Sequence, residues 1–115
     1  MNNDWRVIQY AQSNGRLPVS EFIHAQDDAT KDRIEEAVER LRVLNVKAAY
    51  PLVRPIEGRL WELRIGSQTN IYRVFYFFWT GRQIVLLHAF QKKTQKTPNR
   101  EIQVALKRMS EYLEL

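Results

Sequence analysis

Cysteine is absent from this 115-residue chain, and histidine occurs only twice, as His24 and His88. The absence of thiols excludes disulfide scaffolds, thiolate metal sites and cysteine nucleophiles. Residues 59–108 hold only two carboxylates, Glu62 and Glu101, so a metal-dependent nuclease site is not expected there. No serine lies in a nucleophile elbow, and the four glycines form no phosphate-binding loop. We therefore expect no metal and no cofactor.

Long apolar runs are also missing. The longest stretches, residues 74–79 and 84–87, have the length of strands, far below the roughly 20 residues that cross a bilayer. The first five residues are polar and acidic, whereas a secretory signal has a basic residue and then an apolar stretch. We therefore expect a cytoplasmic protein without a membrane segment. The hydrophobic share of 44% is typical of folded proteins, and the length fits a single domain over residues 1–115.

Acidic residues are scarce in the second half of the chain. Residues 1–58 hold eight Lys/Arg and nine Asp/Glu, whereas residues 59–108 hold ten Lys/Arg and two Asp/Glu. The net charge of +5 therefore comes from the second half. Clustered cations favour a polyanionic partner, above all nucleic acid, because they displace counterions from phosphates. A solvated basic surface is the alternative interpretation.

The first half of the chain predicts one strand and two helices. Alternating side chains indicate the strand, and apolar residues recurring at helical spacing indicate the longer helix. Prolines and a glycine interrupt the segment that follows. We expect a strand at 5–11, a short helix at 19–25, a helix starting from Thr30 as N-cap, and a loop at 48–58.

The second half predicts three consecutive strands and a final helix. In the first strand, Glu62 and Arg64 point away from the apolar face, because strands have a two-residue period. The second strand is apolar on both sides, as expected of a central strand with both faces covered. We expect strands at 60–65, 71–79 and 83–91, a hairpin loop at 66–70, a basic loop at 92–96, and a helix with Thr97 as N-cap. The predicted order is β-α-α-β-β-β-α.

Five cations follow from this strand pattern as candidates for one shared surface. Neighbouring antiparallel strands lie about 5 Å apart, so basic residues of consecutive strands can gather on one face or rim. The candidates are Arg64 on the first of the three strands, Arg73 on the second, and Lys92, Lys93 and Lys96 beyond the third. We expect them to form a phosphate-binding surface.

Each of these residues also has a structural interpretation. Arg73 can be an arginine paired with Glu62 across the hairpin, and Arg64 and the lysine loop can be ordinary solvated charge. His88 in an apolar strand is more typical of a core histidine with satisfied ring nitrogens than of a catalyst. The aromatic residues 75–79 fit a core, although one outward ring could stack on a base.

Three segments of the second half carry a family resemblance. They read Gly-Arg-Leu-Trp-Glu-Leu-Arg-Ile at 58–65, Tyr-Arg-Val-Phe-Tyr at 72–76, and Leu-His-Ala-Phe-Gln-Lys-Lys-Thr-Gln-Lys-Thr-Pro at 87–98. Together they resemble the phage-derived HigB-like branch of the RelE/HigB toxins. The similarity covers about the last 60 residues, and the first 50 fit in element order only.

The resemblance implies a fold and a function. The fold is α+β and RelE-like, with an antiparallel-rich sheet and helices packed on one face. The function is that of a type II toxin–antitoxin toxin, a metal-independent mRNA endoribonuclease that inhibits translation and arrests growth, usually in the ribosomal A site. The expected partners are mRNA and a helix-turn-helix antitoxin, through which alone DNA is contacted. No membrane partner is expected.

The resemblance also assigns roles to residues. Arg73 matches the family arginine of the Tyr-Arg-x-x-Tyr strand, Arg64 a basic residue on the preceding strand, and Lys92 or Lys93 the basic position after the last strand. Either lysine, or Glu62, is a candidate for proton transfer. The further RNA-binding candidates are Arg59, Lys96, Arg100 and His88.

Two departures from the family pattern keep a second function open. Some relatives have a second lysine where this chain has Glu62, and the tyrosine that others place near the start of the final helix is missing. The alternative is therefore a non-catalytic RNA-binding or regulatory module on the same fold.

Overall fold

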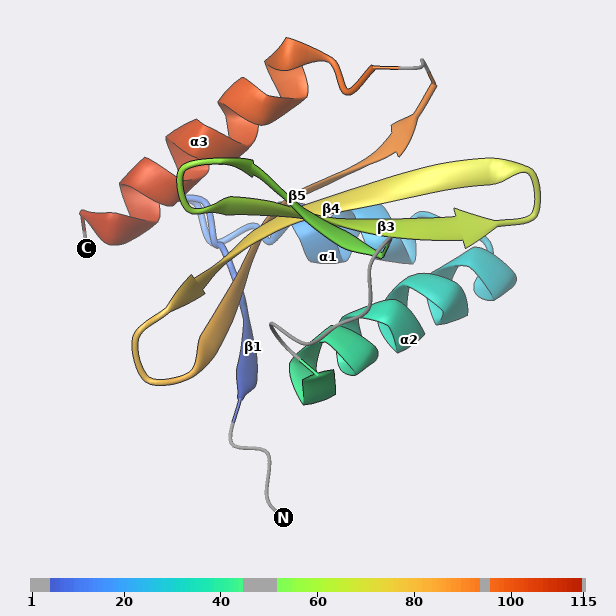
Figure 1. Ribbon diagram of the computed structural model, residues 1–115, viewed down its shortest axis with the longest axis horizontal. Helices are drawn as coiled ribbons and strands as arrows, with labels where there is room; N and C mark the ends of the chain where they lie inside the picture. Colours follow the sequence, from blue (N-terminus) through green and yellow to red (C-terminus); the bar gives the residue numbers. More distant parts are fainter. Residues whose placement is uncertain (1–4, 45–51, 94–95, 115) are drawn as a thin grey trace.

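The computed structural model describes residues 5–44, 52–93 and 96–114, which form one five-stranded sheet and three helices (Figure 1). The strands lie in the spatial order β1-β5-β4-β3-β2. They are β1 (Arg6–Gln9), β2 (Val53–Glu57), β3 (Leu60–Ser67), β4 (Asn70–Trp79) and β5 (Gln83–Lys92). β1 is parallel to β5, and the three other pairings are antiparallel. The expected α+β class with an antiparallel-rich sheet is confirmed.

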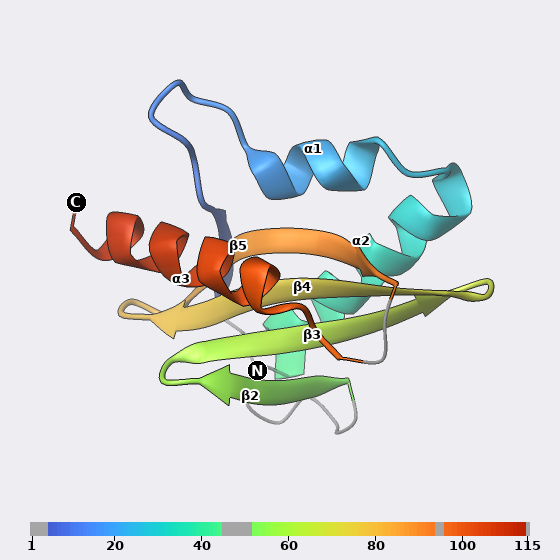
Figure 2. The same ribbon diagram turned by 90° about the horizontal axis from the view of Figure 1, so that it is seen from above.

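The three helices lie on both faces of the sheet, so the expectation that they share one face was wrong. They are α1 (Pro18–His24), α2 (Asp28–Leu44) and α3 (Asn99–Leu113). α1 and α2 lie on one face of the sheet and α3 lies on the other (Figure 2), and their buried side chains belong to two separate core clusters. The apolar β4 requires this arrangement, because its alternate side chains need cover on both sides.

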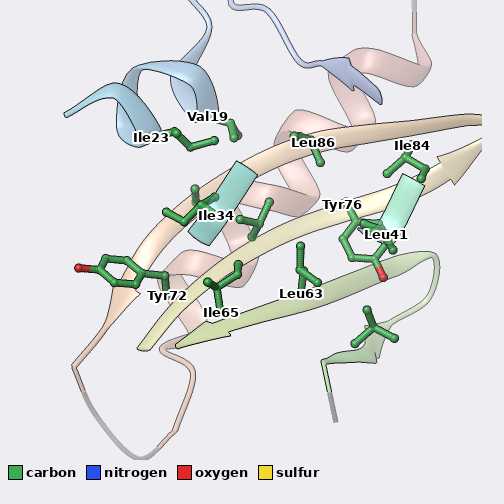
Figure 3. Close-up of a cluster of buried hydrophobic side chains, with 13 residues drawn as sticks. Val19, Ile23, Ile34, Leu41, Leu63, Ile65, Tyr72, Tyr76, Ile84 and Leu86 are labelled. Atoms are coloured by element: carbon green, nitrogen blue, oxygen red, sulfur yellow. The ribbon is translucent and has the colours of Figure 1, made fainter. Parts of the chain in front are cut away.

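The α1–α2 face holds the larger apolar core (Figure 3). Val19 and Ile23 from α1 and Ile34 and Leu41 from α2 point onto the strands, and all four are at most 5% exposed. The helical spacing of these apolar positions is what makes the two helices amphipathic. Their strand partners in the cluster include Leu63, Ile65, Tyr72, Val74, Tyr76, Ile84 and Leu86.

The α3 face is built by the alternate residues of the same strands. Leu60, Phe75, Phe77 and Phe90 are buried there against Ala105 of α3. Residues two positions further along these strands share the face, because successive strand side chains alternate. The polar side chains that continue this alternation therefore lie on the α3 side of the sheet. They are found in β3, near the start of β4 and at the end of β5.

The strand β2 is additional to the four strands expected from the sequence, which predicts a loop at 48–58. Residues 45–51 lie outside the described part, but residues 53–57 pair with β3, with a register shift between Pro55 and Glu57. Proline is tolerated because β2 is an edge strand, where a missing N–H removes no ladder bond on the open side. A proline-containing segment therefore forms the edge of the sheet.

Both expected helix caps were also wrong. The backbone N–H of Thr30 donates to Asp27 Oδ1 at 2.9 Å, so Asp27 caps α2 and Thr30 lies inside it. The residue before α3 is Pro98, whereas the hydroxyl of Thr97 donates to Glu62 Oε2 at 3.2 Å. Thr97 thus ties the segment before α3 to the sheet.

Among the described residues, no helix is both long enough and apolar enough to cross a membrane.

Candidate functional site

The strand register gathers four cations around one carboxylate on the α3 face. Arg54 of β2 lies opposite Glu62 of β3, and Arg64 of β3 lies opposite Arg73 of β4. Lys92, at the end of β5, lies two positions beyond Phe90, which is opposite Arg73. We call Arg54, Arg64, Arg73 and Lys92 the basic cluster. It has one cation on each of four neighbouring strands.

Glu62 is the anion at the centre of the basic cluster. Its side chain is fully buried. Oε1 accepts from Arg73 Nη1 at 2.5 Å and from Arg54 Nε at 2.8 Å, and Oε2 accepts from the Thr97 hydroxyl. A carboxylate held by two guanidiniums and a hydroxyl is a fixed counter-ion, because both of its oxygens already accept hydrogen bonds from the protein. The expected pairing of Arg73 with Glu62 is confirmed.

Arg73 is almost entirely buried, with 8% of its side chain exposed. Burial lowers the pKa of its guanidinium below the usual range, against the opposing effect of the Glu62 carboxylate. Its Nε is buried and has no hydrogen-bond partner within the described residues. A buried donor without a partner is costly.

Arg64 is exposed and lies directly opposite Arg73 on the same face. Like charges placed opposite each other destabilise a sheet, so this pair does not contribute to stability. Two guanidiniums side by side can instead hold a phosphate or another anion, which relieves their mutual repulsion.

Lys92 is the half-buried lysine of the basic loop, whereas Lys93 is exposed. Burial, and next the positive charge of Arg73, lower the pKa of the Lys92 ammonium below its usual range. A lysine with a lowered pKa loses its proton more readily near neutral pH. The structure therefore distinguishes Lys92 from Lys93, which the sequence left equivalent.

Arg54 is the member of the basic cluster that sequence reasoning missed. It lies in the segment expected to be a loop, so no strand periodicity pointed to its face. Its position opposite Glu62 follows only from the β2–β3 pairing. The face on which Arg54 lies could be inferred only after the pairing of β2 with β3 was known.

His88 lies in the contact between β5 and α3, with both ring nitrogens engaged. Nε2 is 2.6 Å from Glu101 Oε1, and Nδ1 is 3.2 Å from Arg108 Nη1. Arg108 Nη1 also donates to the Leu87 carbonyl oxygen at 2.9 Å. Burial lowers the pKa of His88, which favours the neutral ring that can accept from Arg108. This is the satisfied histidine that the sequence offered as the alternative to a functional one.

The other expected RNA-binding residues are not all brought together. The guanidinium carbon of Arg59 lies 4.8 Å from the ring centre of Trp79. Trp79 is six residues along β4 from Arg73, so Arg59 is about 20 Å from the basic cluster. Lys96 is exposed and directly precedes Thr97, so it lies beside the basic cluster. Arg100 is exposed in the first turn of α3, with Nε 3.8 Å from Glu101.

Two other expectations concern metal and aromatic contacts. In the described segments, no three His, Asp or Glu side chains gather as a potential metal site. Phe75, Tyr76 and Phe77 are fully buried, so the core interpretation of this aromatic run is confirmed for them. The half-buried Phe78 and Trp79 complete the run at the end of β4 away from the basic cluster.

Comparison with known proteins places this site in a family. Two curated relatives named "Probable endoribonuclease HigB1", from Mycobacterium tuberculosis strains CDC 1551 / Oshkosh and ATCC 25618 / H37Rv, are 45% identical over 56 residues. This alignment covers 49% of the chain and 44% of each relative, so the chain matches less than half of their length. The family model "Phage derived protein Gp49-like (DUF891)" matches residues 21–110. The chain therefore belongs to the phage-derived Gp49-like family, a family of RelE/HigB-type toxins.

Proposed function

We propose that the protein is the toxin of a type II toxin–antitoxin module and acts in the cytoplasm as a metal-independent endoribonuclease on mRNA in the ribosomal A site. One observation carries this proposal. Four cations gather on four neighbouring strands, and two of them, Arg54 and Arg73, pair with the buried carboxylate of Glu62, in a member of a toxin family. The name of the matched relatives, which describes a probable endoribonuclease, supports the same activity.

The reaction that fits this site is transesterification within the RNA. The 2′-oxygen forms a bond to the adjacent phosphorus while its proton passes to a base. The P–O5′ bond breaks while the 5′-oxygen takes up a proton, which leaves a 2′,3′-cyclic phosphate and a free 5′-hydroxyl. Because the nucleophile belongs to the substrate, the protein supplies placement, positive charge and proton transfer.

Arg64 and Arg73 have the chemistry needed to hold the scissile phosphate. Their guanidiniums stay charged throughout the reaction and donate in a planar fork to the non-bridging oxygens. Arg73 cannot swing freely, because Glu62 fixes its Nη1 from within the core. A donor that is already oriented costs little reorganisation when negative charge develops on the phosphate.

Lys92 is the residue that we assign to proton transfer. Its lowered pKa favours the neutral amine that can accept the 2′-hydroxyl proton. Glu62, the other candidate base, has no exposed surface, and both of its oxygens accept bonds from the protein. Glu62 therefore acts as the counter-ion of the arginines, while Lys93, Lys96 and Arg100 contact RNA around the site.

Arg73→Ala in an induced-expression assay tests the proposal. Expression of the wild-type protein should arrest growth and translation, and a folded Arg73→Ala variant should not. Arg40→Ala removes the same charge from an exposed position on α2, across the sheet, and should stay toxic. Arg73→Lys keeps a cation beside Glu62 and covers the case in which the alanine variant fails to fold. A folded variant of Arg73 with full toxicity would remove this residue from the catalytic set.

The antitoxin is proposed to be a helix-turn-helix DNA-binding protein, through which alone the complex contacts DNA. It either covers the basic cluster or docks on the helices and blocks entry to the ribosome. The two modes are separated by calorimetric titration of this protein with a helix-turn-helix protein encoded by the gene next to its own. If the antitoxin covers the basic cluster, Arg64→Ala should weaken its binding by about 2 to 5 kcal/mol, because a desolvated charge pair is broken. If the antitoxin docks on the helices, its affinity should not change. No binding to the wild type would refute the partner.

A non-catalytic RNA-binding module remains the second candidate, because Glu62 is engaged as a counter-ion and leaves Lys92 as the only proposed base. That module would bind RNA with the same salt dependence but would leave every phosphodiester intact. Cleavage by the purified protein on translating ribosomes therefore distinguishes the two functions.

A further inference from the structure

Arg54 shares the buried carboxylate of Glu62 with Arg73 from the opposite side. Arg54 Nε and Arg73 Nη1 both contact Glu62 Oε1, so the two guanidiniums lie within about two hydrogen-bond lengths of each other. Arg54 is on β2, the edge strand, and Arg73 is on β4 beyond β3. Glu62 therefore joins an edge arginine to the buried arginine of the site.

The bonding of Arg54 differs from that of Arg16 and Arg42, two other arginines that pair with carboxylates. Arg16 and Arg42 each use both Nε and Nη2 to close a fork on their own partners, Glu21 and Glu39. Arg54 contacts Glu62 through Nε, and within the described residues the structure records no partner for its terminal nitrogens. Its side chain is 49% exposed, so these donors are available to a ligand.

The charge around Arg54 selects an anion as that ligand. Burial is the main cause of the lowered pKa of Arg73 and of Lys92, and the positive charge of Arg54 adds a smaller lowering to both, so its charge reaches both residues. Cations in the basic cluster outnumber the carboxylate four to one. This excess is a liability in the free protein, and a polyanion that spans the cluster relieves it.

The position of Arg54 within the cluster indicates which part of the anion it meets. Arg64 lies opposite Arg73, and Lys92 lies beyond Phe90 on the strand at the other side of Arg73. Arg54 lies on the far side of Glu62 from these residues, at the edge of the sheet. A phosphate held by Arg64, Arg73 and Lys92 therefore leaves Arg54 to meet the next phosphate of the same strand.

We propose that Arg54 is a further RNA-binding residue that contacts the phosphate next to the scissile one, and that Glu62 positions Arg54 and Arg73 together. This proposal rests on the proposed function, because it assumes an RNA strand at the basic cluster. It directs that strand from β5 across the sheet toward β2. It also gives Glu62 a role that a lysine at the same position would not fill.

Equilibrium binding of an uncleavable RNA at several salt concentrations tests this inference. A 2′-O-methyl oligonucleotide blocks the nucleophile, so that binding is measured without reaction. Arg54→Ala should bind about fivefold more weakly at low salt, and the slope of log affinity against log salt should fall by roughly 0.7, the value for one phosphate contact on a single strand. Arg40→Ala, with the same loss of charge on α2, should keep the wild-type slope.

A second variant separates folding from binding. Arg54→Gln retains a donor for Glu62 and removes the charge, so it should lose the same slope even if Arg54→Ala unfolds. In cleavage assays, both folded variants should raise KM more than they lower kcat, because the contact lies beside the reacting phosphate. If both Arg54 variants keep the salt dependence of Arg40→Ala, the RNA-binding role of Arg54 is wrong, while the proposed function stands. A wild-type protein without salt-dependent binding would overturn the proposed function as well.

Discussion

At the scale of single residues, Glu62 explains the arrangement of the site. Burying a carboxylate between two arginines costs desolvation energy that the ion pairs offset only with good geometry, so such a group is weak evidence for stability. Here it fixes the direction of Arg73 and Arg54 and holds Thr97 at the start of the segment leading to α3. The residue that departs from the family pattern is thus the one that organises the cations.

Removing Glu62 should destabilise the protein strongly. Glu62→Ala leaves Arg73 buried without its partner, and breaking a buried pair in this way costs about 3 to 5 kcal/mol in the free energy of unfolding. Denaturant unfolding measures this loss. Glu21→Ala breaks the exposed pair with Arg16 and serves as the control, with little change expected. A loss no larger than that of the control would show that Glu62 is not an essential counter-ion.

Lys92 should set the pH dependence of cleavage. If the neutral amine is the base, the rate rises with pH until the lowered pKa of Lys92 is passed. In Lys92→Arg the guanidinium keeps the charge and cannot lose its proton, so cleavage should fall by roughly 10² to 10⁴ while RNA binding persists. Lys93→Arg, one residue away, should behave like the wild type. An unchanged rate and pH profile in Lys92→Arg would exclude it as the base.

At the scale of elements, periodicity predicted most of the fold. The strand from residue 60 and the helix α2 follow from alternation and helical spacing, and the next two strands follow from short apolar runs bounded by turn residues, all of which are local signals. β2 was missed because prolines suggested a loop, and the edge position that tolerates Pro55 is a property of the finished sheet. The apolar sequence of β4 predicts cover on both faces of the sheet. The structure agrees with this pattern and not with the expectation that the helices share one face.

The site was predictable to the same degree. Arg64, Arg73 and Lys92 were identified because they lie in or directly after strands with a clear pattern. Arg54 was not identified, because its face depends on the pairing of β2. The burial of Glu62 was also hidden, since a charged residue opposite the apolar face of a strand ordinarily points to solvent, and here Thr97 in the segment before α3 contacts it.

The contact of α3 with β5 should weaken in acid. Burial lowers the folded-state pKa of His88 below its usual 6.5, so the unfolded chain takes up this proton first as the pH falls. The contribution of His88 to stability is therefore lost as the pH drops from 6.5 through the folded-state pKa. Protonation also removes the acceptor that Arg108 uses. Unfolding measured between pH 7 and 5 should show a flatter dependence for His88→Gln.

The second histidine supplies the control for this experiment. His24 is exposed on α1, so His24→Gln removes a histidine and leaves the contact of α3 with β5 intact. Equal pH dependence in His88→Gln and the wild type would show that the contact of α3 with β5 does not titrate through His88.

At the scale of the whole molecule, part of the charge asymmetry of the sequence is gathered at one place. Of the ten basic residues of 59–108, three lie on the strands of the basic cluster, three lie in α3 and four lie in turns and loops, where Arg59 is remote from the cluster. Arg54 adds a cation from the first half of the chain. The opposite face of the sheet is covered by α1 and α2. RNA binding and cleavage are therefore expected on the α3 side at the ends of β3, β4 and β5, beside the start of α3.

The chemical nature of the cleaved ends tests the central claim most directly. Purified protein is incubated with translating ribosomes on an mRNA whose cleavage position has been mapped. We predict a 2′,3′-cyclic phosphate and a 5′-hydroxyl at the cut, and no cut when the nucleotide before the scissile bond is 2′-deoxy. An intact mRNA, or cleavage of the 2′-deoxy substrate at the same bond, would contradict the account.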